Sequence, residues 1–292
     1  MPDNFPKISI VTATFNQGDY IEESIRSVID QEYPNLELII MDGGSTDDTV
    51  NIIRKYERHI TFWTSEKDNG LYDALHRGFQ KTSGDIMGWL NSDDLLIRKS
   101  LFSLADIFSN NTDIEWVQGH PCIADDSGRV IFQRQPRFSK YSFYSKQYHD
   151  GIFIQQESTY WRRSLWQKSG QEISTKYKYA GDFELWMRFF KYADLFTTPA
   201  LIGAFRMRKG QISQEHYQAY LKECDQIIDS YLPGLSQMDQ EYLHELNHTG
   251  SQSVFNRILR KAGLKTVVPP DSVKHEVTFD HELQIFRKNE GN

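Results

Sequence analysis

The chain has 292 residues, of which 39% are hydrophobic and 25% are charged, and its formal net charge is −7. This length can bury a core large enough for one big α/β domain with a helical appendage, and the composition is that of an ordinary globular protein. The acidic balance argues against a general nucleic-acid binder, whose surface is basic.

The first part of the chain, up to residue 94, alternates between strand-like and helix-like segments. Short β-branched apolar runs, typical of buried parallel strands, are followed by segments whose apolar residues recur at helical spacing. The expected strands cover residues 8–13, 36–41, 60–64 and 86–90, and the expected helices cover residues 20–31, 49–58 and 71–82. This alternation predicts an α/β fold with a doubly wound, mainly parallel sheet flanked by helices.

Acidic residues follow three of the expected strands. Asp42 ends the second strand, Glu66 and Asp68 follow the third, and Asp93 and Asp94 follow the fourth. Ligands of open α/β sheets bind beyond the carboxyl ends of the strands, so these acids are expected to meet at a binding crevice. The chain has no glycine-rich phosphate loop, and the alternative way to hold a diphosphate is a divalent cation bridged to carboxylates. Asp93 is the natural ligand for that cation.

Beyond about residue 116 the pattern becomes aromatic and irregular, notably over residues 138–148. A helix-like stretch covers residues 182–192, and a short basic loop over residues 206–211 follows it. The remainder, residues 214–292, predicts a charged helical C-terminal extension.

Cysteine usage and the apolar pattern bear on location. Cys122 and Cys224 form neither a disulfide framework nor a zinc spacing, which favours a reducing cytoplasm. We expect no export signal and no transmembrane span, because no run of about 18 apolar residues occurs. Residues 251–270 combine cations with apolar residues and no acid, which suits either a solvated face or peripheral contact with an anionic membrane. The cations of that stretch are Arg257, Arg260, Lys261 and Lys265.

Several short motifs carry a resemblance to a known family. They are VTATFN at 11–16, MDGGSTDDT at 41–49, DNGLYDA at 68–74, LNSDD at 90–94, QQESTYWRR at 155–163 and GDFELWMR at 181–188. Together they resemble the family 2 glycosyltransferases, which have the GT-A fold. The resemblance implies a GT-A catalytic domain over residues 1–213. Residues 1–115 would bind a nucleotide-sugar, and residues 116–213 would hold the acceptor.

The resemblance also implies donor-binding positions. Ala13 and Phe15, in the loop after the first strand, would hold the nucleobase, and Asp42 would sit at the base or ribose. Asn91 and Asp93 stand where the family has an Asp-x-Asp motif, so Asp93 would bind a divalent metal, Mn²⁺ or Mg²⁺. Asn91 replaces the first acid of the motif and can still hydrogen-bond a ribose hydroxyl. From the residues alone, Asp42 and Asp93 can also be turn caps.

Asp182 matches the catalytic carboxylate of the family. In an inverting transfer the incoming hydroxyl loses a proton as it attacks the anomeric carbon, and a carboxylate within reach supplies the general base. Two alternatives stay open: Asp182 can cap a helix, and Glu184 is the nearest rival base. Asp94 is either a second metal ligand or, as we favour, a helix cap.

Two further segments bear on the donor site that the resemblance implies. Asp68 of the third motif is expected to contact the donor, but the usual Ala-Arg-Asn of the family is replaced there by Ala74-Leu-His76, so contacts to the diphosphate are expected from elsewhere. Arg206, together with Arg208 and Lys209, stands where the mobile loop of the family closes over the donor. We expect one of these three cations to neutralise the leaving group.

The predicted function is inverting transfer of a sugar from a nucleotide-diphosphate donor, most often UDP-linked in this family, to a hydroxyl of a glycan or lipid-linked glycan. The resemblance implies a place in surface polysaccharide synthesis. Two other functions compete. A sugar-1-phosphate nucleotidyltransferase is disfavoured, because such enzymes carry a glycine- and arginine-rich loop after the first strand. A catalytically degenerate nucleotide- or sugar-binding protein is favoured by Asn91 and disfavoured by Asp93 and Asp182.

Overall fold

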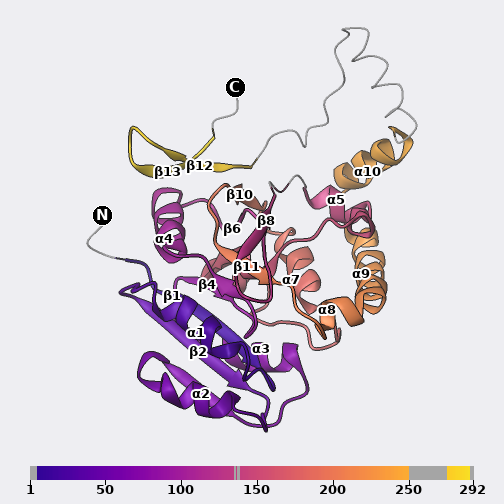
Figure 1. Cartoon of the computed structure of the whole chain (residues 1–292). Helices are drawn as coiled ribbons and strands as arrows, with labels where there is room; N and C mark the ends of the chain where they lie inside the picture. The colour runs from indigo at the N-terminus through magenta and orange to yellow at the C-terminus, as the bar shows by residue number, and fades with distance from the viewer. Residues whose placement is uncertain (1–4, 135, 137–138, 250–274, 290–292) are drawn as a thin grey trace.

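The computed structural model of the chain describes residues 5–134, 136, 139–249 and 275–289. Its centre is a seven-stranded sheet with helices on both faces (Figure 1). The strands are β1 (Ile8–Thr14), β2 (Leu36–Asp42), β3 (Phe62–Ser65), β4 (Ile86–Trp89), β6 (Trp116–Gly119), β9 (Thr159–Arg162) and β10 (Phe196–Thr198). Their order is β10-β6-β9-β4-β1-β2-β3, and neighbours are parallel except that β9 runs antiparallel to β4 and β6. The predicted mainly parallel sheet is confirmed.

The helices before residue 190 lie between these strands in the chain. They are α1 (Ile21–Ile29), α2 (Thr49–Lys55), α3 (Leu71–Phe79), α4 (Ser100–Asn110), α5 (Lys140–Tyr144), α6 (Arg163–Lys168) and α7 (Gly181–Phe189). Short 3₁₀ turns are η1 (Glu57–His59), η2 (Gln147–Asp150) and η3 (Gln156–Ser158). The strands and helices expected before residue 94 are therefore present, with ends shifted by up to three residues. The expected helix over 49–58 divides into α2 and η1.

Alternation along β1 explains the two layers of helices. Ile8 and Ile10 point into a core shared with α1, α2 and α4, whereas Val11 and Ala13 point into a core shared with α3 and α7. Because successive side chains of a strand face opposite sides of the sheet, a fully apolar strand requires cover on both faces. The carboxyl ends of β1, β2 and β4 stay uncovered by this packing, and polar loops follow them.

A cluster of tryptophans fixes α7 to the sheet. The ring of Trp186 on α7 stacks on that of Trp89 on β4, with centroids 5.4 Å apart and an interplanar angle of 3°. It also stacks on Trp116 of β6, with centroids 5.8 Å apart. Aromatic pairs of this kind contribute stability beyond the area they bury. The cluster holds the first turn of α7, and with it Asp182, at a fixed place relative to β4.

A second, four-stranded sheet brings a late segment to the acidic loop. It contains β5 (Leu95–Leu96), β7 (Cys122–Ala124), β8 (Val130–Gln133) and β11 (Gly203–Arg206), in the order β5-β11-β7-β8. Since β5 directly follows the 91–94 loop and pairs antiparallel with β11, the basic loop after β11 reaches the carboxyl end of β4.

The C-terminal extension is helical in its first half. Its helices are α8 (Ile212–Glu215), α9 (Tyr217–Tyr231) and α10 (Gln237–Thr249), with the 3₁₀ turn η4 (Leu232–Gly234) between the last two. In addition, β12 (Val277–Asp280) and β13 (Ile285–Lys288) form an antiparallel hairpin that packs beside α4 (Figure 1). The sequence pattern did not predict this hairpin. Helix α9 packs along α7 and so belongs to the same body as the seven-stranded sheet.

Residues 251–270, for which a solvated face and peripheral membrane contact were the two alternatives, lie outside the described residues. Within the described part of the chain, no helix is long and apolar enough to cross a membrane.

Candidate active site

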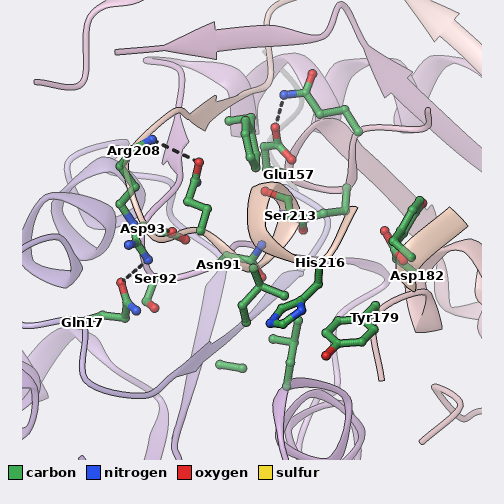
Figure 2. Close-up of a pocket in the computed structure, with 18 of the residues that line it drawn as sticks. Gln17, Asn91, Ser92, Asp93, Glu157, Tyr179, Asp182, Arg208, Ser213 and His216 are labelled. Atoms are coloured by element: carbon green, nitrogen blue, oxygen red, sulfur yellow. Dashed lines mark hydrogen bonds and ion pairs between the residues drawn. The ribbon is translucent and has the colours of Figure 1, made fainter. Parts of the chain in front are cut away.

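A cavity of about 840 Å³ opens at the carboxyl ends of β1, β2 and β4. Figure 2 shows Asp93 and Arg208 on one side of it and Tyr179 and Asp182 on the other, with Asn91 between them in this view. The cavity thus includes residues from both predicted halves of the chain, 1–115 and 116–213. The sequence-predicted residues that line it are Ala13, Phe15, Asp68, Asn91, Asp93 and Asp182.

Asp93 is held by a cation from the loop after β11. Its Oδ2 lies 2.9 Å from Nε of Arg208, and both side chains are mostly buried. An Nη2 hydrogen of Arg208 is donated to Oε1 of Gln17, in the loop after β1, at 3.0 Å. Arg208 therefore spans the space between two loops that line the cavity, as Figure 2 shows.

Arg206, the predicted donor contact, lies behind the acidic loop and not on the cavity wall. It is 1% exposed, and its Nε donates to the carbonyl oxygen of Asp93 at 2.7 Å. The two Nη atoms donate to the carbonyl oxygen of Asp126 at 2.8 Å and to Oε2 of Glu23 at 2.6 Å. These bonds use each nitrogen of the guanidinium group, so Arg206 supports the loop, and the neighbouring Arg208 is the arginine that reaches the cavity.

Asp42 also lies off the cavity wall. Its side chain is buried, and Oδ2 accepts hydrogen bonds from the backbone N–H groups of Gly44 and Ser45 at 3.1 and 2.9 Å and from the Ser65 hydroxyl at 2.6 Å. A carboxylate bonded in this way shapes the turn after β2. Gly43 of the same turn lines the cavity, so Asp42 acts on the cavity through the backbone that it holds.

Asp94 ties three segments together beneath the cavity. Its Oδ1 accepts the backbone N–H of Arg206 at 3.0 Å, and its Oδ2 accepts the side-chain amides of Asn91 and Gln156, both at 3.2 Å. The favoured interpretation of Asp94 as a helix cap is wrong, because the next helix, α4, has Lys99 at its N-cap. The sequence could not show that the acid folds inward beneath β11.

Glu157 is an acid that sequence reasoning missed. It lines the cavity but is only 1% exposed, and its carboxylate accepts a hydrogen bond from the side chain of Gln155. Burial raises the pKa of Glu157 to about 8, and the nearby charge of Asp93 adds to the shift. Burial, followed by the charge of Glu157, likewise raises the pKa of Asp94 well above its usual range. Glu157, with a pKa of about 8, therefore adds little negative charge to the cavity at neutral pH.

Asp182 lies in the first turn of α7. The Tyr72 hydroxyl is 3.0 Å from its Oδ1, and burial raises the pKa of Asp182 to about 6. The alternative interpretation as an N-cap is wrong, since Ala180 occupies that position. The rival base Glu184 does not line the cavity; it pairs with Arg188 at 2.9 Å and accepts the hydroxyl of Tyr231 at 3.0 Å.

The fit of a metal can be judged from Asp93. Among the described residues, no group of three or more His, Cys, Asp or Glu side chains could hold an ion by itself. Asp93 offers one carboxylate at the cavity, and this carboxylate is paired with the guanidinium group of Arg208. Mg²⁺ in nucleotide sites is commonly held by one or two carboxylates together with substrate phosphates. The residues present therefore fit a cation that shares a diphosphate and do not fit one held by protein alone.

Comparison with known proteins identifies the family of this chain. The family model described as "Glycosyl transferase family 2" matches residues 9–168. The chain belongs to glycosyltransferase family 2. TuaG, a putative teichuronic acid biosynthesis glycosyltransferase of Bacillus subtilis, is 35% identical over 94 residues, which is 30% of this chain and 36% of that protein. The chain spans only 34 to 36% of the length of TuaG and of two other curated relatives.

Solved structures share the fold. Staphylococcus aureus TarS 1-349 in complex with UDP-GlcNAc aligns with a TM-score of 0.65 and 17% identity, covering 84% of this chain and 73% of TarS. The mannosyltransferase PcManGT of Pyrobaculum calidifontis, in complex with GDP-Man and Mn²⁺, aligns with a TM-score of 0.54 and 16% identity, covering 89% and 83%. The predicted GT-A fold is confirmed.

Proposed function

We propose that this family 2 chain is an inverting, metal-dependent glycosyltransferase that uses a nucleotide-diphosphate sugar. The observation that carries the proposal is that one cavity is lined at one end by Asp93, the acid of the Asn91-Ser-Asp motif, and at the other by Asp182. A group for the leaving diphosphate and a group for the incoming hydroxyl thus share one space. That pairing is what a single displacement requires.

The donor is proposed to bind at the Asp93 end. Ala13, near the end of β1, and Phe15, in the loop after it, line the cavity, and the Phe15 ring is 57% exposed and so accessible to a nucleobase. Asn91 also lines the cavity and can bond a ribose hydroxyl. The structures of TarS with UDP-GlcNAc and of PcManGT with GDP-Man, both of this fold, support a nucleotide-sugar donor.

Asp93 is the residue proposed to hold the divalent cation, Mn²⁺ or Mg²⁺. When bound, such a cation stabilises negative charge that develops on the leaving diphosphate. If Arg208 releases the carboxylate when the cation binds, its guanidinium group becomes free to bond phosphate oxygens, which it fits well. The presence of Mn²⁺ in the PcManGT complex supports this assignment.

Asp182 is proposed to act as the general base. The acceptor oxygen forms a bond to the anomeric carbon while the bond from that carbon to the phosphate oxygen breaks, and its electron pair leaves with the diphosphate. The proton of the acceptor hydroxyl passes to Asp182. With a pKa raised to about 6, this carboxylate is ionised at neutral pH and is a stronger base than an ordinary aspartate.

The acceptor is proposed to be a glycan or lipid-linked glycan of a surface polysaccharide. Several aromatic rings line the cavity, and such rings pack against the apolar faces of sugars. They include Phe132, Phe153, Tyr179, Tyr217 and Tyr220. The name of TuaG, which refers to teichuronic acid biosynthesis, supports a polymer acceptor.

A thermal-shift panel tests the donor site. Melting temperature is measured with UDP, GDP, dTDP and CDP, each with Mn²⁺ and each with EDTA. A ligand at about 100 times its dissociation constant stabilises the folded state by about 2.7 kcal/mol, which raises the melting temperature measurably. We expect one diphosphate to give this rise in Mn²⁺ and to lose it in EDTA. The absence of a shift with all four would contradict a metal-bridged donor site.

A further inference from the structure

The backbone just before α7 is held by one carboxylate from the C-terminal extension. Glu223 of α9 accepts three consecutive N–H groups: Oε1 accepts that of Lys178 at 3.0 Å, and Oε2 accepts those of Tyr179 and Ala180 at 2.8 and 2.9 Å. Hydrogen bonds from backbone N–H groups to an ionised carboxylate are stronger than neutral ones. The carboxylate also lies at the N-terminal end of α7, where the helix dipole favours negative charge.

The same segment is held from its other side by α3. The hydroxyl of Tyr72 lies 2.8 Å from the carbonyl oxygen of Tyr179 and 3.0 Å from Oδ1 of Asp182. A Cβ atom at position 181 would lie only 2.8 Å from carbons of the Tyr72 ring, so glycine at this position permits the close approach. The segment over residues 178–182 is therefore clamped between α3 and α9.

Helix α9 presents one continuous face to this segment. Tyr220, Glu223 and Cys224 are spaced three and four residues apart, which puts them on the same side of a helix. At the start of the helix, the ring of His216 stacks on that of Tyr179 with centroids 4.8 Å apart. Since α9 follows the loop that contains Arg208, it connects the donor end of the cavity to the segment that carries Asp182.

We propose that Glu223 is a positioning residue, which holds residues 178–180 so that the first turn of α7 presents Asp182 to the acceptor hydroxyl. The inference rests on the proposed role of Asp182 as the general base. It makes the extension part of the catalytic unit, although Glu223 itself does not line the cavity.

The charges around Asp182 provide a readout beyond stability. The groups that face it are Tyr72 from α3, Glu157 from η3, and Tyr220, Glu223 and Cys224 from α9. Burial is the largest cause of the raised pKa of Asp182, and the negative charge of Glu223 adds to it. Replacing Glu223 with glutamine keeps the side-chain length, removes this charge, and leaves one acceptor oxygen in place of two. The pKa of Asp182 is then expected to fall.

The test is the Glu223→Gln variant, assayed with the nucleotide-sugar identified for the wild type. We expect kcat to fall by about tenfold to a hundredfold, because a small displacement of a catalytic group is this costly. The KM for the nucleotide-sugar is expected to stay unchanged, and the acid limb of the kcat/KM profile to move to lower pH. Asp229→Asn is the matched control: it also removes a charge from α9, but Asp229 pairs only with the side chain of Lys146, at 2.8 Å, among the described contacts.

The results with these variants decide the matter. A wild-type kcat and pH profile for Glu223→Gln would overturn the inference, as would a lower kcat with an unmoved acid limb. If the glutamine variant melts too low to assay, Glu223→Asp replaces it. The aspartate keeps the negative charge but has a shorter side chain, so kcat should fall while the acid limb of the pH profile stays in place. A wild-type kcat for Glu223→Asp would overturn the inference. The Asp182→Asn variant, measured in parallel, separates the two proposals. If its turnover survives, the proposed role of Asp182 as general base is contradicted; if its turnover is lost while Glu223→Gln behaves as the wild type, only the proposed role of Glu223 is contradicted.

Discussion

Replacing Asp182 with asparagine is expected to lower kcat by about 10² to 10⁴-fold, the contribution typical of a general base. The amide keeps the size of the side chain and can still accept the hydrogen bond from Tyr72, but it cannot take up a proton at neutral pH. Nucleotide binding should be unchanged, because Asp182 lies at the opposite end of the cavity from Asp93 (Figure 2). Steady-state kinetics with the donor identified by thermal shift measure this loss.

The wild-type pH profile checks the same assignment. Activity requires the ionised form of Asp182, and its pKa is about 6, so kcat/KM should fall on the acid side of about pH 6 and by about tenfold for each further pH unit. This acid limb should be absent from the residual activity of Asp182→Asn. Glu184→Gln is the comparison variant, since Glu184 pairs with Arg188 away from the cavity. If Glu184→Gln loses turnover while Asp182→Asn retains it, the general base is Glu184 and the assignment of Asp182 is wrong.

Replacing Asp93 with alanine is expected to remove the metal dependence of donor binding. A bound cation contributes several kcal/mol to charge stabilisation, so affinity for the nucleoside diphosphate in Mn²⁺ should fall by about two orders of magnitude or more, to the level of the wild type in EDTA. Isothermal titration of both proteins with the diphosphate, in Mn²⁺ and in EDTA, measures the difference.

Arg208 offers the competing explanation and the control. In Arg208→Gln the dependence of binding on the metal should persist, because Asp93 keeps its carboxylate, although the proposed contact between Arg208 and the phosphate oxygens is lost. If instead Arg208 alone neutralises the diphosphate, the wild type should bind equally well in EDTA, and Asp93→Ala should bind more tightly because the arginine is released. That pair of results would rule out the proposed metal site.

The sheet was predictable because its signals are local. The apolar β-branched runs of β1, β2 and β4 and the helical spacing of α1 and α3 lie within short windows, and the acids after the strands follow from the same alternation. The hairpin of β12 and β13 was missed because its strands have only four residues each and are stabilised by packing on α4.

The site was predictable only in part, because burial depends on tertiary contacts. Arg206 and Arg208 are equivalent on sequence grounds, yet the end of β11 buries the first behind the acidic loop and leaves the second at the cavity. Glu157 could not be singled out from the sequence because its altered pKa comes from burial and from the nearby charge of Asp93, both of which depend on the folded structure. Tyr72 and Glu223 meet the segment before Asp182 from helices far away in the chain, and no local spacing signals that meeting.

Release of nucleoside diphosphate from a panel of UDP-, GDP-, dTDP- and CDP-linked sugars tests the central claim most directly. The wild type is incubated in Mn²⁺ with each donor, with water as the stand-in acceptor, beside Asp182→Asn and an EDTA control. We expect release from the donors of one nucleobase, lost in EDTA and reduced in Asp182→Asn. Equal release by wild type and Asp182→Asn, or none from any donor, would contradict the claim that Asp93 and Asp182 serve one glycosyl-transfer site.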